Sequence, residues 1–245
     1  MSRVLVIIPA FNEEESLAHV VAAVRTSLPQ AEIAVVNDGS RDRTAAVVEK
    51  LQVVAFHLPH HVGVGAAEQT GFRFAARQGY DIVVRNDGDG QHRPAEIPLL
   101  LSAVSDENVD VVIGSRYLED RGYVTPRLRR LGIHLLAGVV SLACRQRFTD
   151  PTSGFRAFSR RAILFCAQDY PSAYPEPESV VQFVRAGLKV REIPVTMNPR
   201  YGGRSSIRVA ESVYYMVRVL MGILVELLRG RPPIPPEGGG QGGHP

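Results

Sequence analysis

Residues 82–92 read Ile82-Val83-Val84-Arg85-Asn86-Asp87-Gly88-Asp89-Gly90-Gln91-His92, an apolar run that ends in two carboxylates flanked by glycines. The end of a strand with this composition can hold a hard divalent cation through oxygen ligands. It can also be a solvated Asp-Gly turn. A calcium loop of the EF-hand type is excluded, because the sixth position from Asp87 is His92 rather than Gly and the twelfth is Pro98 rather than Glu. We interpret His92 as a structural residue rather than a ligand.

Four further apolar, β-branched runs accompany this one, at residues 4–8, 33–36, 53–56 and 109–113. Segments of helical character lie between the runs, at residues 13–27, 42–51, 66–78 and 94–105. This alternation predicts an α/β domain with a doubly wound, mostly parallel sheet flanked by helices. Ligands bind beyond the carboxyl ends of such strands, and three of these ends are polar: residues 9–13, 37–40 and 87–91. Ser40 is expected to cap the helix after the second end, with Asp42 near its positive pole.

The alternation is less regular beyond residue 115. We predict helices over 127–144 and 178–186, a loop over 150–158 that returns to the sheet, and a strand over 190–195. A long helix follows over 206–229, and its longest uncharged run, 219–225, is far shorter than the ~20 residues that a membrane span needs. This helix is expected to pack on the domain, to form a dimer or to contact a membrane surface. The predicted organisation is one domain over 1–205, this amphipathic helix over 206–230 and a disordered Pro- and Gly-rich tail over 231–245.

Composition indicates a globular protein of 245 residues, 45% of them hydrophobic, with a concentrated basic region. Residues 116–161 contain ten arginines and three acidic residues, which suits phosphate groups or an anionic membrane surface rather than nucleic acid. Cys144 and Cys166 show no metal-ligand spacing and are interpreted as buried small hydrophobes. Because no basic or long apolar segment precedes the first strand, we expect a cytoplasmic protein, peripheral at the inner face of the cell membrane.

Taken in order, the strand ends resemble those of the family 2 glycosyltransferases with the GT-A fold, in particular the dolichol-phosphate mannose synthases and polyprenyl-phosphate glycosyltransferases. The resemblance extends from about residue 4 to residue 206. Its motifs are Val6-Ile7-Ile8-Pro9-Ala10-Phe11-Asn12-Glu13, Val36-Asn37-Asp38-Gly39-Ser40-Arg41-Asp42-Arg43-Thr44, Gly63-Val64-Gly65-Ala66-Ala67, Asp87-Gly88-Asp89-Gly90-Gln91-His92, Gly114-Ser115-Arg116-Tyr117, Asp150-Pro151-Thr152-Ser153-Gly154-Phe155-Arg156 and residues 200–206.

The resemblance implies a single Rossmann-like domain and a set of site residues. It implies that the donor nucleoside is bound by Pro9, Phe11, Glu13, Val36 and Asp38. It implies that Asp87, Gly88, Asp89 and Gln91 hold Mg²⁺ or Mn²⁺ and the sugar diphosphate, with Asp87, Asp89 and Gln91 as metal ligands. It implies phosphate contacts for Arg116 and Arg200. We further predict a phosphate contact for Arg129 and catalytic roles for Asp89, Glu176 and Arg200. The chain departs from the family pattern at Asn37, His61 and Ser206, where Asp, Asn and Lys are frequent.

Physical chemistry supports a metal at this position independently of the resemblance. Charge builds on the departing diphosphate when a nucleotide-sugar bond breaks, and a cation that bridges its oxygens stabilises that charge. Two carboxylates leave a divalent cation with open positions for those oxygens. Gly63-Val64-Gly65 fits a dinucleotide site poorly, because Glu68 stands where a small residue is needed; we interpret Gly65 as a close approach to the donor or a packing feature.

The acceptor is the open question. A sugar hydroxyl needs a general base, for which Asp150, Glu176 and Glu178 are candidates, whereas a lipid phosphate with a second pKa near ~6 is already ionised. The arginine-rich region favours the phosphate, and the two glutamates favour the hydroxyl unless they begin a helix.

We predict metal-dependent, inverting transfer from a GDP-mannose or UDP-glucose type donor to a polyprenyl phosphate. Two alternatives are transfer to a sugar hydroxyl of a polysaccharide or glycolipid, with Glu176 as base, and a non-catalytic module that binds anionic lipid. A membrane-protein partner or a homodimer could use the 206–229 helix. The sequence leaves open the donor base and sugar, the metal and the oligomeric state.

Overall fold

The computed structural model describes residues 2–105, 109–119, 127–172, 175–198, 209–231 and 233–234, with backbone alone for 127–129 and 209–213. Its sheet has seven strands in the order β3-β2-β1-β4-β6-β5-β7. The strands are β1 (Val4–Ala10), β2 (Glu32–Asn37), β3 (Val54–His57), β4 (Ile82–Arg85), β5 (Val111–Ser115), β6 (Arg156–Ser159) and β7 (Val190–Pro194). β6 runs antiparallel to β4 and β5, and the other pairs of neighbouring strands are parallel. The predicted mostly parallel α/β sheet is confirmed.

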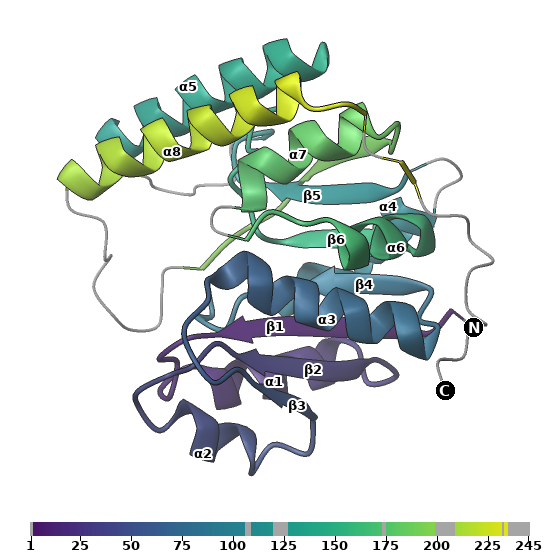
Figure 1. Cartoon of the computed structure of the whole chain (residues 1–245). Helices are drawn as coiled ribbons and strands as arrows, with labels where there is room; N and C mark the ends of the chain where they lie inside the picture. The colour runs from purple at the N-terminus through teal and green to yellow at the C-terminus, as the bar shows by residue number, and fades with distance from the viewer. Residues whose placement is uncertain are drawn as a thin grey trace, which may run out of the picture.

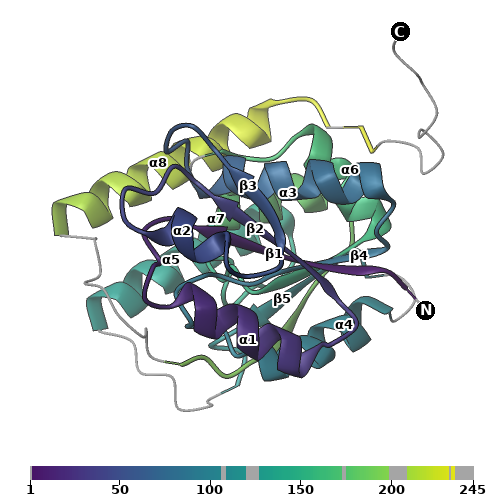
Figure 2. The same ribbon diagram turned by 90° about the horizontal axis from the view of Figure 1, so that it is seen from below.

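Helices cover both faces of the sheet (Figure 1). They are α1 (Leu17–Ser27), α2 (Thr44–Val48), α3 (Val64–Gln78), α4 (Ile97–Ser105), α5 (Arg127–Cys144), α6 (Arg160–Gln168), α7 (Pro175–Arg185) and α8 (Val209–Leu228), with a 3₁₀ turn at Pro94–Glu96. In Figure 2 α1 and α4 lie on one side of the sheet, and α3, α6 and α8 lie on the other. None of the described helices has the length and apolar content needed to cross a bilayer.

The strands alternate their side chains between two hydrophobic cores, as the period of two requires. Ile7 and Val36 belong to the core under α3, α5, α6, α7 and α8, whereas Ile8 and Val35 belong to the core under α1 and α4. All seven residues of β1 are buried. A strand that is buried on both faces has a continuous apolar sequence, which explains why residues 4–8 could be recognised from composition.

The region around β6 differs from the prediction. Residues 156–159 form a strand rather than part of a loop, and α6 follows at once because Ser159 accepts a hydrogen bond from the backbone N–H of Ala162. A four-residue strand with Arg156 at its start lacks the apolar signal, and Arg156 is buried through hydrogen bonds that its sequence position does not reveal.

Two smaller predictions also need correction. Ser40 caps no helix, since its hydroxyl accepts from the N–H of Asn12, and Asp42 accepts from the N–H of Thr44 at the start of α2. Cys166 is buried as predicted, but Cys144 is only partly buried. The predicted tail at 231–245 and helix residues 206–208 lie largely or wholly outside the described residues.

The strand order reverses between β1 and β4. From β1 the chain moves to β2 and β3 on one side, and β4 then pairs with β1 on the other side. Because neighbouring parallel strands present their carboxyl ends at one edge, this reversal opens a crevice there. It brings the residues that follow β1 together with those that follow β4.

Candidate active site

A cavity of about 570 Å³ lies at this edge of the sheet. Of the predicted donor residues, Pro9, Phe11, Glu13, Asp38, Asp87, Gly88 and Asp89 all line it. The full lining is Pro9, Ala10, Phe11, Glu13, Asp38, His61, Val62, Gly63, Val64, Ala67, Arg85, Asp87, Gly88 and Asp89. Val36 is not brought to the cavity, because its side chain is fully buried in the core under α3.

The loop after β4 is held by contacts with its own members. Asp89 Oδ1 accepts the N–H of Gln91 at 3.0 Å, and His92 Nδ1 accepts the N–H of Asp87 at 2.9 Å. Burial lowers the pKa of His92, so its imidazole is neutral and carries its proton on Nε2, 3.4 Å from Asp87 Oδ2. The ring also stacks on Phe155 with centroids 4.8 Å apart. These contacts give His92 the structural role expected of it.

The donor set of this loop fits a hard divalent cation. Asp87 and Asp89 supply carboxylate oxygens at the cavity wall. Within the described part of the chain, no group of three or more His, Cys, Asp or Glu side chains could hold a metal by itself. Two carboxylates with open positions are suited to Mg²⁺ or Mn²⁺ that completes its shell with substrate phosphates and water. Gln91 is half-buried and absent from the lining, so its ligand role stays a prediction.

Asp38 organises the wall opposite this loop. Its carboxylate accepts the N–H groups of Val62 and Gly63 at 2.9 and 3.0 Å, and His61 Nδ1 lies 2.8 Å from Oδ2. Gly63 has φ of +102°, a conformation that favours glycine. The His61 ring stacks on Phe11 with centroids 3.9 Å apart. Asp38 therefore holds this loop in place, and its direct contact with a nucleobase stays a prediction.

At the cavity wall, one guanidinium contacts three acidic side chains. Arg85 lies 3.0 Å from Glu68, 3.1 Å from Asp87 and 2.8 Å from Glu176, and its side chain is 3% exposed. Glu68 also accepts a hydrogen bond from the Tyr170 hydroxyl at 2.7 Å. Burial, with the neighbouring charges of Glu176 and Asp87, raises the pKa of Glu68 to about 8.

Sequence reasoning identified Asp87 and Glu176 as site residues but missed Arg85 and Glu68, which join them in this cluster. An arginine that directly follows the apolar run 82–84 was the available signal for Arg85, and a glutamate in an alanine-rich helix start was the signal for Glu68.

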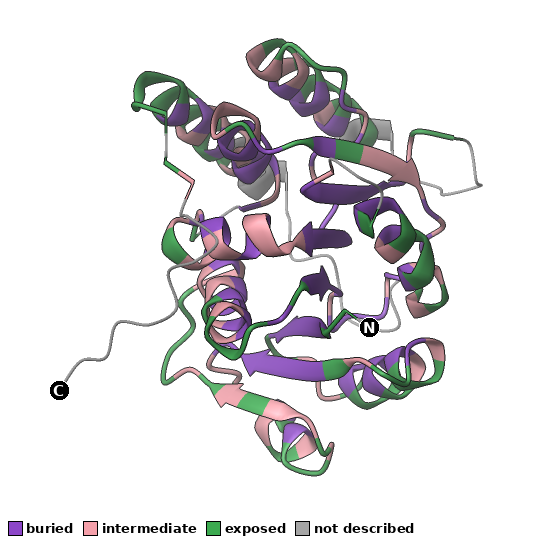
Figure 3. Cartoon of the chain, turned by 90° about the vertical axis from the view of Figure 1, so that its right-hand side faces the viewer, coloured by how far each residue is buried: buried purple, intermediate pink, exposed green. Residues whose placement is uncertain are grey.

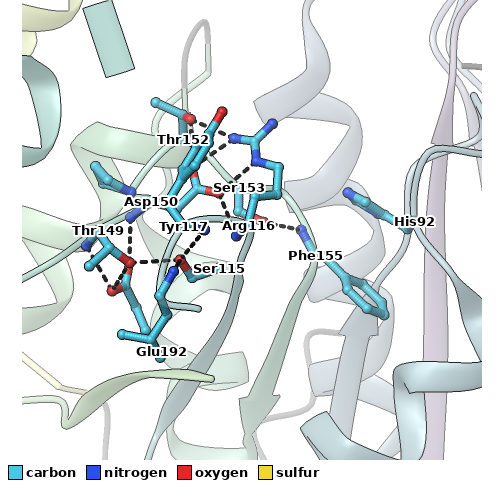
Figure 4. A network of polar contacts seen from close by, with 12 residues as sticks. His92, Ser115, Arg116, Tyr117, Thr149, Asp150, Thr152, Ser153, Phe155 and Glu192 are labelled. Carbon is cyan, nitrogen blue, oxygen red and sulfur yellow. Dashed lines mark hydrogen bonds and ion pairs between the residues drawn. The ribbon is translucent and has the colours of Figure 1, made fainter. Parts of the chain in front are cut away.

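A second buried network surrounds Arg116 (Figure 4). Asp150 is fully buried, and its carboxylate accepts hydrogen bonds from Arg116 Nε at 2.6 Å and from Nη2 at 2.7 Å. Arg116 Nη2 also donates to the hydroxyl of Thr152. Glu192 accepts the backbone N–H groups of Thr149 and Asp150. The structure therefore gives Arg116 an internal partner, and its predicted phosphate contact is untested. The side chain of Arg129 and all of Arg200 lie outside the described residues.

Gly65 is a packing position rather than a donor contact. A Cβ at this residue would lie 1.9 Å from the carbonyl oxygen of Pro171, and the Gly65 N–H donates to Ser172. The close approach locks the start of α3 against the segment that precedes α7.

An α/β sheet whose strand order reverses between β1 and β4, with a pair of carboxylates on the wall of the cavity at the strand ends, is the architecture of a GT-A glycosyltransferase. The family model described as "Glycosyl transferase family 2" matches residues 5–165, and the chain belongs to that family. The predicted glycosyltransferase activity is thereby confirmed at the level of the family.

Two curated relatives are similar over most of their length. The chain is 35% identical to the polyprenol monophosphomannose synthase of Mycolicibacterium smegmatis, with 84% of this chain and 81% of the relative covered. It is 32% identical to the undecaprenyl-phosphate mannosyltransferase of Micrococcus luteus, with 94% and 98% covered. Among solved structures, glucosyl-3-phosphoglycerate synthase from Mycobacterium tuberculosis, crystallised with Mn²⁺, UDP and phosphoglyceric acid, shares the fold at a TM-score of 0.69. It is 22% identical, with 92% of this chain and 78% of that chain covered.

Proposed function

We propose that the protein transfers a hexosyl group from a nucleoside-diphosphate sugar to a polyprenyl phosphate at the cytoplasmic face of a membrane, with Mg²⁺ or Mn²⁺ at Asp87 and Asp89. The observation that carries the choice of acceptor is that each carboxylate considered as a general base is either ion-paired with an arginine or directed at α8. A hydroxyl acceptor needs a base that can take its proton. A phosphate acceptor needs none.

The three candidate bases are held in different ways. Asp150 is buried in its ion pair with Arg116. Glu176 accepts from Arg85 Nη2 at 2.8 Å, so a proton on its carboxylate would weaken the pairing of a buried guanidinium. Glu178 does not line the cavity, because its carboxylate lies against Gly222 of α8.

The cavity supports the donor half of the proposal. Its volume suits a nucleotide, and the Phe11–His61 stack offers a flat apolar surface for a base. One curated relative is named for the synthesis of polyprenol monophosphomannose and the other for mannosyl transfer with undecaprenyl phosphate, which supports a mannosyl donor. A bound cation would neutralise charge on the leaving diphosphate.

The proposed reaction is a single displacement. An anionic oxygen of the lipid phosphate forms the new bond to the anomeric carbon while the bond to the diphosphate breaks on the opposite face. The electron pair leaves with the nucleoside diphosphate and the configuration inverts. The protein's own contribution is to fix the donor with the 61–63 and 87–91 loops and to orient the acceptor oxygen for in-line attack.

Glu176→Gln tests the acceptor, with Glu68→Gln as its matched control. The assay measures the initial rate of product formation by mass spectrometry, with a short-chain polyprenyl phosphate and either GDP-mannose or UDP-glucose in the presence of Mn²⁺. Both variants change an acidic side chain that contacts the Arg85 guanidinium, so an equal small loss reports that shared change. We expect each variant to keep at least a tenth of the wild-type rate.

A loss of a thousandfold or more confined to Glu176→Gln would identify Glu176 as a base and favour the hydroxyl acceptor. Absence of product from the wild type with every donor and a phosphate acceptor would contradict the proposed function itself.

A further inference from the structure

The outer side of α8 carries an exposed apolar stripe. Val217, Met221, Leu224 and Leu228 recur at steps of four, three and four, and they are between 48% and 79% exposed. Val219 and Ile223, on the opposite side of the helix, are buried in the core. A helix that has filled its inner side and still exposes large apolar residues along its outer side has a second apolar face.

α5 carries a matching stripe and lies beside α8 (Figure 1). Leu131, Leu135 and Leu142 are 67%, 54% and 81% exposed. Gly132 of α5 faces Met216 of α8, which shows that the two helices are in contact. Figure 3 shows exposed outer surfaces on the helices at the top of the molecule. We call these residues of the two helices the α5–α8 surface.

Among the described side chains of α5 and α8, the exposed charges have one sign. Arg130 and Arg218 are exposed on the two helices, and Arg147 is exposed just beyond the end of α5. Among the described side chains of the two helices the acidic residue is Glu226, which is 4% exposed. Apolar side chains interspersed with arginines are the pattern of a helix that lies in the interface of an anionic bilayer.

From this combination we infer that the α5–α8 surface docks on an anionic lipid bilayer, with the arginines at the headgroups and the leucines below them. The inference rests on the proposed function for its purpose, since a lipid phosphate must enter from a membrane. α7 links the surface to the site: Glu176 in its first turn contacts Arg85, and Glu178 in the same turn packs against Gly222 of α8. Docking would therefore place the acceptor side of the site beside the bilayer.

The test is vesicle flotation of the full chain, with vesicles that contain no polyprenyl phosphate. Wild type should float with vesicles of 30% phosphatidylglycerol in phosphatidylcholine and much less with pure phosphatidylcholine. Leu142→Glu and Leu228→Glu should each weaken binding roughly tenfold, and Arg147→Glu about fivefold or more, with the arginine effect fading at high salt.

The controls are Leu99→Glu on α4 and Arg77→Glu on α3, which change exposed residues outside the α5–α8 surface and should bind like wild type. Equal losses in test and control variants, or no flotation of the wild type, would overturn the inference. So would a wild-type dimer in light scattering that Leu228→Glu dissociates, because the surface would then be a subunit interface. Transfer to a short soluble acceptor separates the two proposals. Leu228→Glu should keep turnover with the soluble acceptor while losing transfer to acceptor embedded in vesicles. If the wild type turned over the soluble acceptor but did not float with vesicles, the docking inference would be rejected and the proposed function would stand.

Discussion

Replacing Arg116 by methionine should destabilise the protein far more than loss of a surface arginine would. The Arg116 side chain makes two charge-assisted hydrogen bonds to Asp150, at 2.6 and 2.7 Å, and Asp150 has no exposed surface. Such bonds contribute roughly 1.5–3 kcal/mol each, and breaking a buried ion pair costs about 3–5 kcal/mol. We therefore expect Arg116→Met to lower the free energy of unfolding by about 3–5 kcal/mol. In a chain of this size that corresponds to a fall of roughly 6–20 °C in Tm.

Urea unfolding followed by circular dichroism measures this loss. Arg43→Met is the matched control, because Arg43 pairs with Glu14 at 3.0 Å while its side chain is 86% exposed, and such pairs contribute ~1 kcal/mol or less. Adding Asp150→Asn to Arg116→Met should recover most of the stability, since the buried charge is then gone. The reasoning is refuted if Arg116→Met unfolds within 1 kcal/mol of wild type while its affinity for phosphate-bearing ligands falls. Arg116 would then be a ligand contact first, as the sequence suggested.

Three further predictions concern the cavity and its supports. Asp89→Ala should abolish turnover and the Mn²⁺-dependent part of nucleotide binding measured by calorimetry, and a wild-type rate would reject the metal site. The pKa of Glu68 rises from 4.5 to about 8 on folding, so between these pH values the folded protein keeps a proton that the unfolded chain has released. The free energy of unfolding should therefore fall by a few kcal/mol as the pH rises from 4.5 to about 8. Glu68→Gln should flatten this pH dependence of the urea midpoint, and an unchanged slope would reject the assigned pKa. Gly65→Ala should cost about 1–3 kcal/mol or more, because its new methyl group meets a backbone carbonyl. Gly138→Ala lies at an exposed position of α5 with nothing within 4 Å of the new methyl group, so it should be neutral or stabilising by up to ~1 kcal/mol. Equal melting temperatures for the two variants would contradict this difference.

The sequence predicted the fold well where strands are buried on both faces. The runs at 4–8, 33–36 and 82–84 are continuous and β-branched, because each residue in them packs into one core or the other. Of the polar residues that end these runs, Glu13, Asp38, Asp87 and Asp89 line one cavity, since parallel strands share their carboxyl edge. By contrast β6 was missed, because its stability comes from antiparallel pairing with two strands distant in sequence rather than from its own composition.

What the sequence could not show is which charges neutralise one another. Asp150 and Arg116 are 34 positions apart, and Glu176 and Arg85 are 91 apart, so neither pairing leaves a local pattern. Read singly, Arg116 suggested a phosphate ligand and Glu176 suggested a base. In its pair with Asp150, Arg116 holds the loop that follows Asp150. In its pair with Arg85, Glu176 compensates the charge of a buried guanidinium two residues before Asp87. The same pairings engage Asp150 and Glu176, two of the three candidate bases. This engagement, rather than the number of arginines, favours an acceptor that arrives already ionised.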